Sequence, residues 1–473
     1  MFGLTWFFVS DIVNLYDIWY AYRKGEIMTY DVIYIGSGHA AWHGAQELAR
    51  AGKKVALIEQ EKVSGTCTNF GCNAKILLDG PAELLHHLHN YHGIGINDAV
   101  NIVWPELMAY KHQVIDPMDD VMARILAVDG IDIIFGHASF VDEHTIVVAD
   151  ETYTADNFVL AMGQRAAKLP VAGTELTYDS KDFLDLPEMP TSMILIGAGF
   201  IGMEFASIAH TAGSDVTIIE YADRALANFD AEYTQRVVEI MSEKGINFAF
   251  GNAVNEIKAT DNGYIVTTAQ GNQFEAAMVF DTTGRIPNID HMNLEDIGVE
   301  TNRGGVVVND YMQTSVSHIY ASGDVVAKTT PRLTPTATFE SLYIADILLG
   351  KENEAIKYPA VPTVTFTLPR MAQIGVSTTE ANASDEYQVH NINFAQLGMF
   401  ASHHDQEAKV KIVLNRDKQL VGAAIIGDAA PELVNTLVPI INHKYTKDDL
   451  NKTIYAFPTA SAMLPMLLAN FLA

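Results

Sequence analysis

The stretch Asp31-Val-Ile-Tyr-Ile-Gly-Ser-Gly-His-Ala-Ala41 decides the fold of the first part of the chain. Its apolar, β-branched start is typical of a strand buried on both faces, and its glycines predict a tight turn. The residues that follow predict a helix through Arg50 and a second strand over 54–58, which ends at Glu59. Strand, turn, helix and strand in this order predict a parallel sheet with a right-handed crossover.

The same order recurs near the middle of the chain. The strand Met193-Ile-Leu-Ile196 leads into the turn Gly197-Ala-Gly-Phe-Ile-Gly202. A helix to about Ala212 then precedes a strand over 215–219 that ends at Glu220. Both stretches therefore combine a glycine turn with an acidic residue at the end of the next strand.

This combination is suited to a dinucleotide. A glycine turn lets the backbone approach a pyrophosphate at a helix N-terminus, and the carboxylate accepts hydrogen bonds from the adenosine ribose. One such turn is weak evidence, but two in full strand–turn–helix–strand context favour two dinucleotide sites. The residues that we expect to bind are Gly36, Gly38, Ala41 and Glu59 in the first stretch, and Gly197, Gly199, Gly202 and Glu220 in the second.

The only two cysteines, Cys67 and Cys72, directly follow the first stretch. A secreted disulfide scaffold would spread several cysteines along the chain. A close pair in a large α/β protein is more often redox-active or metal-binding, and buried inert thiols are a third interpretation. Zinc would want four ligands, which this pair does not supply. A helix start and Lys75 would favour a thiolate here, so we expect a redox pair and no metal.

A histidine cluster needs separate weighing. His86, His87, His89 and His92 lie on a predicted helix after the cysteines, and two of them one turn apart could bind a metal. We favour a solvated or dimer-facing helix surface.

Composition limits the class of protein. Hydrophobic residues are 49% and charged residues 19%, as in an ordinary globular protein. A formal net charge of −28 argues against nucleic-acid binding, which needs clustered Lys and Arg. Residues 1–27 have an apolar start that Asp11 and Asp17 interrupt. Three interpretations compete. The segment is included only because a start codon upstream of the true one was chosen, or it is an interfacial membrane anchor, or it is an extra packed helix. We favour the first, and expect a cytoplasmic protein without stable membrane association.

The pattern changes from residue 360 onward. Short apolar runs over 361–366, 410–413 and 420–426 predict an antiparallel sheet, and helices are expected around 430–443 and 460–471. The expected fold class is therefore α/β, with two Rossmann-like dinucleotide-binding domains plus a C-terminal α+β domain.

Several further motifs lead to a family. The cysteines lie in Gly65-Thr-Cys-Thr-Asn-Phe-Gly-Cys72, and the second turn continues as Ile201-Gly-Met-Glu204. Three other stretches are Thr283-Gly-Arg-Ile-Pro-Asn288, Ala321-Ser-Gly-Asp324 and Leu333-Thr-Pro335. From residue 28 to the C-terminus the chain resembles the flavoprotein disulfide reductases, the group of dihydrolipoamide dehydrogenase, glutathione reductase and mercuric reductase. Two small departures are Ser64 for a family glycine, and Met162 for the threonine of Ala-Thr-Gly.

The resemblance implies an FAD-dependent oxidoreductase that passes hydride from NADH through the flavin to the Cys67–Cys72 disulfide, and on to a disulfide-type substrate. Cys72 would be the charge-transfer thiolate and Cys67 the interchange thiol. Lys75 would pair with Glu204 beside the flavin, and Phe200 would gate the nicotinamide pocket. Further cofactor contacts are implied for Gly65, Thr66, Gly163, Gly284, Arg285, Asp324, Leu333 and Thr334.

The resemblance implies that the chain forms a homodimer. It also implies a role in cell redox homeostasis. After an N-terminal extension over 1–27, an FAD domain would comprise 28–172 and 291–356, with an NAD(P) domain over 173–290 between them. Residues 357–473 would form the dimerisation domain. We expect NADH rather than NADPH, because Glu220 would repel a 2′-phosphate. Tyr221 replaces a phosphate-binding arginine of glutathione reductase, although Arg224 could reach over the ribose.

The C-terminus departs from the family. Where relatives acting on dithiols or glutathione have His-Pro-Thr-x-x-Glu, this chain has Phe457 and Ala462 at the histidine and glutamate positions. The substrate arginine of glutathione reductase corresponds to Leu342, and the C-terminal cysteine pair of mercuric reductases is absent. The small-molecule electron acceptor therefore stays open. The alternatives are reduction of a non-thiol acceptor, such as a quinone, a metal ion or oxygen, or a flavin-binding redox sensor with low turnover.

Overall fold

The computed structural model describes residues 28–97 and 100–473, and in this part the chain forms two compact units. The first consists of the described residues up to Cys67, with Met118–Gln164 and Pro287–Ile356. The second consists of Thr68–Pro117, Arg165–Ile286 and Lys357–Ala473. The interpretations of residues 1–27 fall outside the described residues, and the domain limits expected from the sequence stay a prediction.

The first unit is built on one mixed sheet. Its strand order is β3-β2-β1-β6-β5-β4, with β18 beside β6. Strands β3, β2, β1, β6 and β18 run parallel, and β1 lies between β2 and β6. The predicted parallel pairing of the first two strands is thus confirmed, and β2 is buried along its whole length. The bounds are β1 (Met28–Ile35), β2 (Val55–Glu59), β3 (Asp132–Phe135), β4 (Ala138–Asp142), β5 (Thr145–Val148), β6 (Glu151–Leu160) and β18 (Ile319–Ala321), with β16 (Thr301–Asn302) and β17 (Gly305–Val306) as a separate pair.

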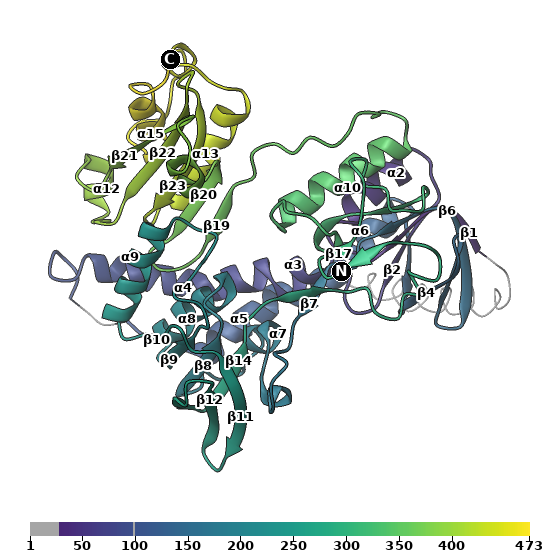
Figure 1. Ribbon diagram of the computed structural model, residues 1–473, viewed down its shortest axis with the longest axis horizontal. Helices are drawn as coiled ribbons and strands as arrows, with labels where there is room; N and C mark the ends of the chain where they lie inside the picture. The colour runs from purple at the N-terminus through teal and green to yellow at the C-terminus, as the bar shows by residue number, and fades with distance from the viewer. Residues whose placement is uncertain (1–27, 98–99) are drawn as a thin grey trace, which may run out of the picture. The chain divides into compact units, whose positions relative to one another are not determined.

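Helices pack close to one another in this unit. Its helical segments are α2 (Trp42–Arg50), α6 (Met118–Val128), η2 (Gly323–Val325) and α10 (Thr334–Leu348). Figure 1 shows α2 and α10 side by side. They touch at Gly44, whose amide donates to the Ser341 hydroxyl at 2.9 Å. A Cβ at Gly44 would lie 2.4 Å from the Ser341 carbonyl oxygen, so only glycine permits this approach.

The second unit contains the second glycine turn. A parallel sheet has the order β10-β9-β8-β14, and a separate antiparallel sheet has the order β11-β12-β13. The strands are β8 (Ser192–Ile196), β9 (Asp215–Ile219), β10 (Asn247–Ala249), β11 (Val254–Thr260), β12 (Gly263–Thr268), β13 (Gln273–Ala276) and β14 (Met278–Asp281). The helices here are η1 (Thr174–Leu176), α7 (Ser180–Leu184), α8 (Phe200–Thr211) and α9 (Ala231–Glu243). Two short strands, β7 (Gln164–Ala166) and β15 (Arg285–Pro287), pair with each other at the two ends of the stretch that contains these helices.

The C-terminal part of the second unit has the predicted antiparallel sheet, in the order β19-β20-β23-β22-β21. Strands β20 and β21 were not expected from the sequence. The bounds are β19 (Thr363–Thr365), β20 (Met371–Gly375), β21 (Tyr387–Asn393), β22 (Lys409–Asn415) and β23 (Leu420–Ile426). Its helices are α11 (Thr378–Asn382), α12 (Gly398–Ser402), α13 (Ala430–Asn442), α14 (Lys447–Asn451) and α15 (Ala460–Leu468).

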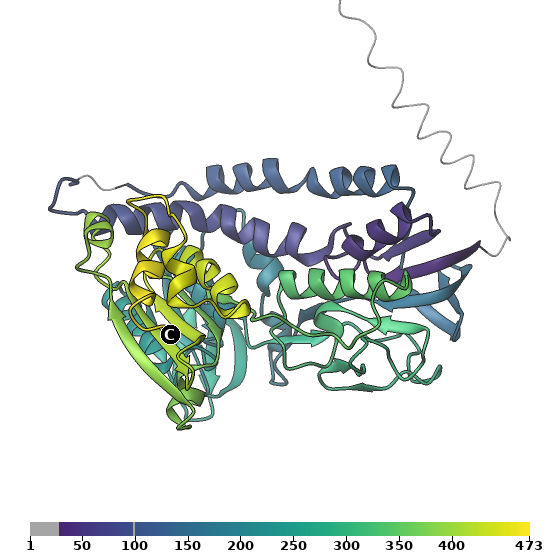
Figure 2. The same cartoon turned by 90° about the horizontal axis from the view of Figure 1, so that it is seen from above.

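The cysteines lie on consecutive helices, α3 (Gly65–Phe70) and α4 (Cys72–Asn90). Helix α4 runs beside α5 (Trp104–Ile115) in the opposite direction (Figure 2). Between residues 28 and 473, leaving out 98 and 99, no helix has both the length and the apolar character that crossing a bilayer requires.

Candidate active site

The first glycine turn depends on close backbone approaches. Gly36 has a φ of +105°, and a Cβ there would lie 2.4 Å from the Ala161 carbonyl oxygen. Gly65 has a φ of +66°, and a Cβ there would lie 2.9 Å from the Cα of Gly38. The first residue of the cysteine motif therefore rests directly on the turn, and a side chain at Gly65 would push it away from Gly38.

The carboxylate of Glu59 is tied to this turn through Ser37. The Ser37 hydroxyl donates to Glu59 Oε2 at 2.5 Å, and the Ser64 amide donates to Ser37 Oγ at 3.0 Å. The second oxygen of Glu59 accepts from the amide of Glu61 at 2.8 Å. Glu59 is thus fixed at the strand end, as an acidic ribose partner requires.

A distant segment closes the first turn. The Ser322 hydroxyl donates to the Ala40 carbonyl oxygen at 2.7 Å, which brings the predicted flavin residue Asp324 to the turn, two residues along the same segment. The buried Glu340 accepts the Gly323 amide at 2.6 Å and forms an ion pair with Lys328. Burial lowers the pKa of Lys328 although Glu340 opposes the shift.

Glu340 and Lys328 were missed from the sequence. The signal was available, since Glu340 is an acidic residue among apolar ones on a helix that begins at the Leu333-Thr-Pro motif. In that motif Leu333 is the N-cap of α10 and Thr334 its first residue.

Gly163 lies in the same unit and has a φ of +64°. Its carbonyl oxygen accepts the Asn288 amide at 3.0 Å, and the Asn288 side chain donates to the Met162 carbonyl oxygen at 2.9 Å. The two predicted motifs around these residues are therefore adjacent. Gly284 and Arg285 belong to the second unit, where the Gly284 carbonyl oxygen accepts the Ala167 amide at 3.0 Å.

The second glycine turn is tied to its acidic residue directly. The Ala198 amide donates to Glu220 Oε2 at 2.7 Å, and the Ala222 amide donates to Oε1 at 2.8 Å. A Cβ at Gly202 would lie 2.1 Å from the Gly197 carbonyl oxygen, so glycine is required where the helix meets the turn. No atom lies within 4 Å of the Cβ position at Gly199.

Both turns fit a dinucleotide. Neither α2 nor α8 has a side-chain hydrogen bond at its N-cap. The open space over Gly199 leaves room for a pyrophosphate beside the N-terminus of α8. Phe200 is the first residue of α8 and is 53% exposed, as a ring that covers an exchangeable ligand would be.

Two helices of the second unit meet at an ion pair. Lys75, on the first turn of α4, donates from Nζ to Glu204 Oε2 of α8 at 2.9 Å. The side chains are 18% and 3% exposed. Cys72 is exposed at the start of α4, and Cys67 is partly buried on α3. The Lys75–Glu204 ion pair that the resemblance implies is thus present, and it joins α4, which begins at Cys72, to α8, which begins at the second turn.

The histidine cluster differs from what we expected. The Nε2 atoms of His86 and His87 contact the two carboxylate oxygens of Asp428, at 3.0 and 3.3 Å. The His86 side chain is only 9% exposed, so it is part of an internal contact and not of a solvated surface. His89 and His92 are exposed, as predicted. In the described ranges, 28–97 and 100–473, no group of acidic, Cys or His side chains has the arrangement of a metal site.

The comparisons with known proteins agree with this geometry. Residues 30–341 match the family described as pyridine nucleotide-disulphide oxidoreductase, and residues 361–467 match its dimerisation domain. The chain is 32% identical over 447 residues to a dihydrolipoyl dehydrogenase of Staphylococcus aureus, covering 92% of this chain and 94% of that protein. It is 30% identical to a glutathione reductase of Burkholderia cepacia, covering 91% and 96%, and 30% identical to a mercuric reductase of Staphylococcus aureus, covering 95% and 83%.

Proposed function

The chain belongs to the pyridine nucleotide-disulphide oxidoreductase family, and from that premise we propose that it uses NADH to reduce a disulfide-type acceptor through Cys67 and Cys72. Members of this family are FAD- and pyridine nucleotide-dependent disulfide oxidoreductases, and they carry the dimerisation domain that residues 361–467 match. The observation that carries the proposal is the Lys75–Glu204 ion pair. It links α4, the helix that begins at Cys72, to α8, the helix that begins at the second glycine turn.

In the first unit, Gly36, Gly38 and Glu59 would hold FAD, with Asp324 at its ribityl chain. In the second unit, Gly199 and Glu220 would hold the nicotinamide nucleotide. Bound FAD would supply the transfer of two electrons from the nicotinamide to the cysteine pair. The protein's own part is to stabilise charge, and the Lys75 ammonium together with the start of α4 would stabilise a thiolate at Cys72.

NADH is the proposed donor because the Glu220 side chain lies at the end of β9, where the ribose is proposed to bind. Its oxygens are held by the Ala198 and Ala222 amides, so the carboxylate cannot easily turn away from a 2′-phosphate. The Arg224 guanidinium donates to the carbonyl oxygens of Ala227 and Phe229. Both bonds come from Nη2, and they hold the guanidinium against its own loop.

The proposed acceptor needs no proton from the position of the missing histidine. Phe457 is 71% exposed beside Tyr455 and Met466, which line the same surface groove. A histidine there would accept a proton from an attacking thiol and return it to the leaving thiolate, which is worth about 10²–10⁴ in rate. Phenylalanine does neither. Aromatic disulfides with low-pKa leaving groups fit this site, and quinones are the second candidate.

We propose a homodimer, in which the dimerisation domain would bring Phe457 of each subunit to the cysteine pair of the other. The test assays wild type and Phe457→His with dihydrolipoamide, glutathione disulfide, an activated aromatic disulfide and a quinone. Ile454→His is the matched control, because it adds a histidine to the same loop at a 97% exposed position.

We expect wild type to turn over the aromatic disulfide, and Phe457→His alone to gain about 10²-fold or more with glutathione disulfide or dihydrolipoamide. Turnover with the quinone and with no disulfide would favour the second candidate. Brisk lipoamide or glutathione turnover by wild type would show that another residue supplies the proton, and would exclude the non-thiol candidate.

A further inference from the structure

The two oxygens of Glu204 have different partners. Oε2 accepts from Lys75 Nζ at 2.9 Å, and Oε1 accepts from the backbone amide of Phe366 at 2.8 Å. Phe366 follows β19 in the C-terminal part of the second unit, about 160 residues beyond Glu204. The carboxylate that pairs with Lys75 is thus held by a segment outside both glycine turns.

The ring of Phe366 also contacts the lysine. Lys75 Nζ lies 4.0 Å from the ring centroid, well within the distance at which an ammonium is attracted to an aromatic face. The charged groups near this ammonium are Glu204 on α8 and Asp79, one turn further along α4. One residue therefore contacts both members of the ion pair, the carboxylate through its amide and the ammonium through its ring.

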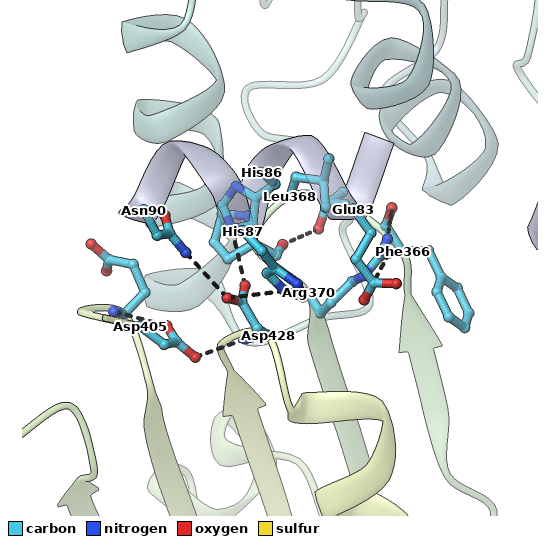
Figure 3. Close-up of polar contacts among 12 residues, drawn as sticks. Glu83, His86, His87, Asn90, Phe366, Leu368, Arg370, Asp405 and Asp428 are labelled. Carbon is cyan, nitrogen blue, oxygen red and sulfur yellow. Dashed lines mark hydrogen bonds and ion pairs between the residues drawn. The ribbon is translucent and has the colours of Figure 1, made fainter. Parts of the chain in front are cut away.

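Phe366 is itself held by Arg370. The guanidinium donates from Nη1 to the Phe366 carbonyl oxygen at 2.8 Å, and its Cζ lies 5.3 Å from the ring centroid. Arg370 is 1% exposed and binds Asp79 through both of its terminal nitrogens, at 2.9 and 2.6 Å. It also contacts Glu83 at 3.2 Å, and Figure 3 shows this contact between α4 and the strands of the C-terminal sheet.

A buried bidentate arginine of this kind fixes geometry on both sides. Burial disfavours a charged guanidinium, but the hydrogen bonds and charges of Asp79 and Glu83 outweigh it and raise the pKa of Arg370. Because Asp79 is one helical turn from Lys75, the same ion pair sets the position of α4 and that of the Phe366 backbone.

From these contacts we infer that Phe366 is a positioning residue: its amide and its ring together fix the Lys75–Glu204 pair, and Arg370 fixes Phe366. The inference rests on the proposed function, in which Lys75 favours the thiolate of Cys72. Without the Phe366 ring, the Lys75 ammonium would be held less firmly and would be better hydrated. It would therefore stabilise the Cys72 thiolate less.

The experiment measures the long-wavelength absorption that the Cys72 thiolate gives beside bound flavin, after anaerobic reduction with two electrons. Its pH midpoint is recorded for wild type, Lys75→Met, Phe366→Leu and Phe366→Tyr. A further protein carries 3,4,5-trifluorophenylalanine at position 366, which weakens the attraction to a cation and keeps the shape. That protein decides the outcome should Phe366→Leu not fold.

The matched control is Tyr233→Leu. Tyr233 lies under Lys411 at 4.6 Å, and Lys411 pairs with Asp230 at 2.8 Å, so the change removes a ring from a similar ion pair elsewhere in the second unit. We expect Tyr233→Leu to lower the melting temperature and leave the midpoint unchanged.

We expect Phe366→Leu to raise the pH midpoint by roughly 0.5 to 1 unit, the fluorinated protein to raise it by less, and Phe366→Tyr to keep the wild-type value. If Lys75→Met raises the midpoint while Phe366→Leu and the fluorinated protein do not, the role of Phe366 is wrong and the proposed function stands. If the wild type shows no such absorption, or Lys75→Met leaves the midpoint unchanged, the proposed function fails first.

Discussion

The two glycine turns have the same backbone plan but are completed by different parts of the chain. In the first, Ser37 connects Glu59 to the turn, and Ser322, more than 280 residues beyond Ala40, closes it. In the second, the Ala198 amide binds Glu220 directly, and the Thr282 hydroxyl, 85 residues beyond Gly197, donates to the Gly197 carbonyl oxygen. The first turn is thus closed by a segment much further along the chain than the second.

The difference matches what each ligand must do. Ala40 is 6% exposed at the first turn, whereas Phe200 is 53% exposed at the second. A turn sealed by remote segments suits a cofactor that stays bound through many turnovers. An open turn with a single movable ring suits a nucleotide that binds and leaves in each one.

The largest expected effect tests the sealed turn. Gly36→Ala would place a Cβ 2.4 Å from the Ala161 carbonyl oxygen at a φ of +105°, and we expect it to remove bound flavin and to cost about 3 kcal/mol or more in stability. Flavin content per chain and thermal unfolding measure this. Gly52→Ala is the control, because its φ is +89° and no atom lies within 4 Å of the Cβ position.

A clash of the same kind in the open turn is made by Gly202→Ala, whose Cβ would lie 2.1 Å from the Gly197 carbonyl oxygen. We expect it to abolish NADH oxidation and leave the flavin bound. If Gly202→Ala releases flavin while Gly36→Ala keeps it, the comparison of the turns is the wrong way round.

The next effect concerns the cysteines that follow the first turn. We expect Cys72→Ser to abolish the long-wavelength absorption of the two-electron-reduced protein. Cys67→Ser should show that absorption without reduction, since it leaves the thiolate of Cys72 without a disulfide partner. Absorption that is independent of Cys72 would reverse the roles of the two thiols.

A smaller effect is expected at the two strand ends. Glu220→Gln keeps an acceptor for the Ala198 amide and removes the charge, so we expect the ratio of NADH to NADPH kcat/KM to narrow by about tenfold. Glu59→Gln should lower flavin affinity and leave the nucleotide preference of the flavin-loaded protein unchanged. A wild-type ratio that favours NADPH would contradict the assignment of Glu220.

The smallest effect is expected at the C-terminal end of α4, at the contact of His86 and His87 with Asp428. Burial would raise the pKa of Asp428, but His86 and His87 outweigh it and hold the pKa well below its usual range. The pKa of His87 is raised by its hydrogen bond to Asp428, and that of His86 is lowered by burial. Asp428 therefore stabilises the fold above about pH 4, and His87 does so below about pH 6.5.

Asp428→Asn should consequently cost about 2 kcal/mol near pH 6 and less near pH 8.5, because His87 loses its charge as the pH rises through its raised pKa. Two further groups belong to this cluster: Asp405, whose pKa burial and the Asp428 charge raise to about 6, and Lys244, which contacts His86 at 2.9 Å. Thermal unfolding at the two pH values measures the effect, with the exposed Asp385→Asn as control. If Asp428→Asn costs the same stability at both pH values, the charge that Asp428 pairs with is not that of protonated His87.

The sequence predicted the parts that short-range pattern controls. The strand, turn and helix over 31–50 are an apolar run, glycines and an amphipathic segment in direct succession, and the structure has each of them. The Lys75–Glu204 pair followed from the resemblance and not from pattern, because 129 residues separate the partners.

What the sequence did not predict depends on distant partners. Nothing near Arg370 indicates that it binds Asp79, 291 residues earlier. A signal existed in retrospect: Asp79 lies on a helix among leucines, and Arg370 lies between apolar residues, where an unpaired charge would be costly. Likewise the His86 contact needed Asp428, which a search for ligands on one helix could not find.

The sealing of the first turn has a consequence for synthesis on the ribosome. Strand β18 must pair with β6, and Ser322 must reach Ala40, before the flavin turn is closed. At about 5–20 residues per second, the ribosome needs roughly 15 to 60 seconds to advance from the first of these residues to the last. The nicotinamide turn is complete once residue 282 has emerged, and so it is ready while the nascent flavin turn still waits for its closing segment. Under the proposed function, flavin loading would therefore be a late event in the life of each new chain.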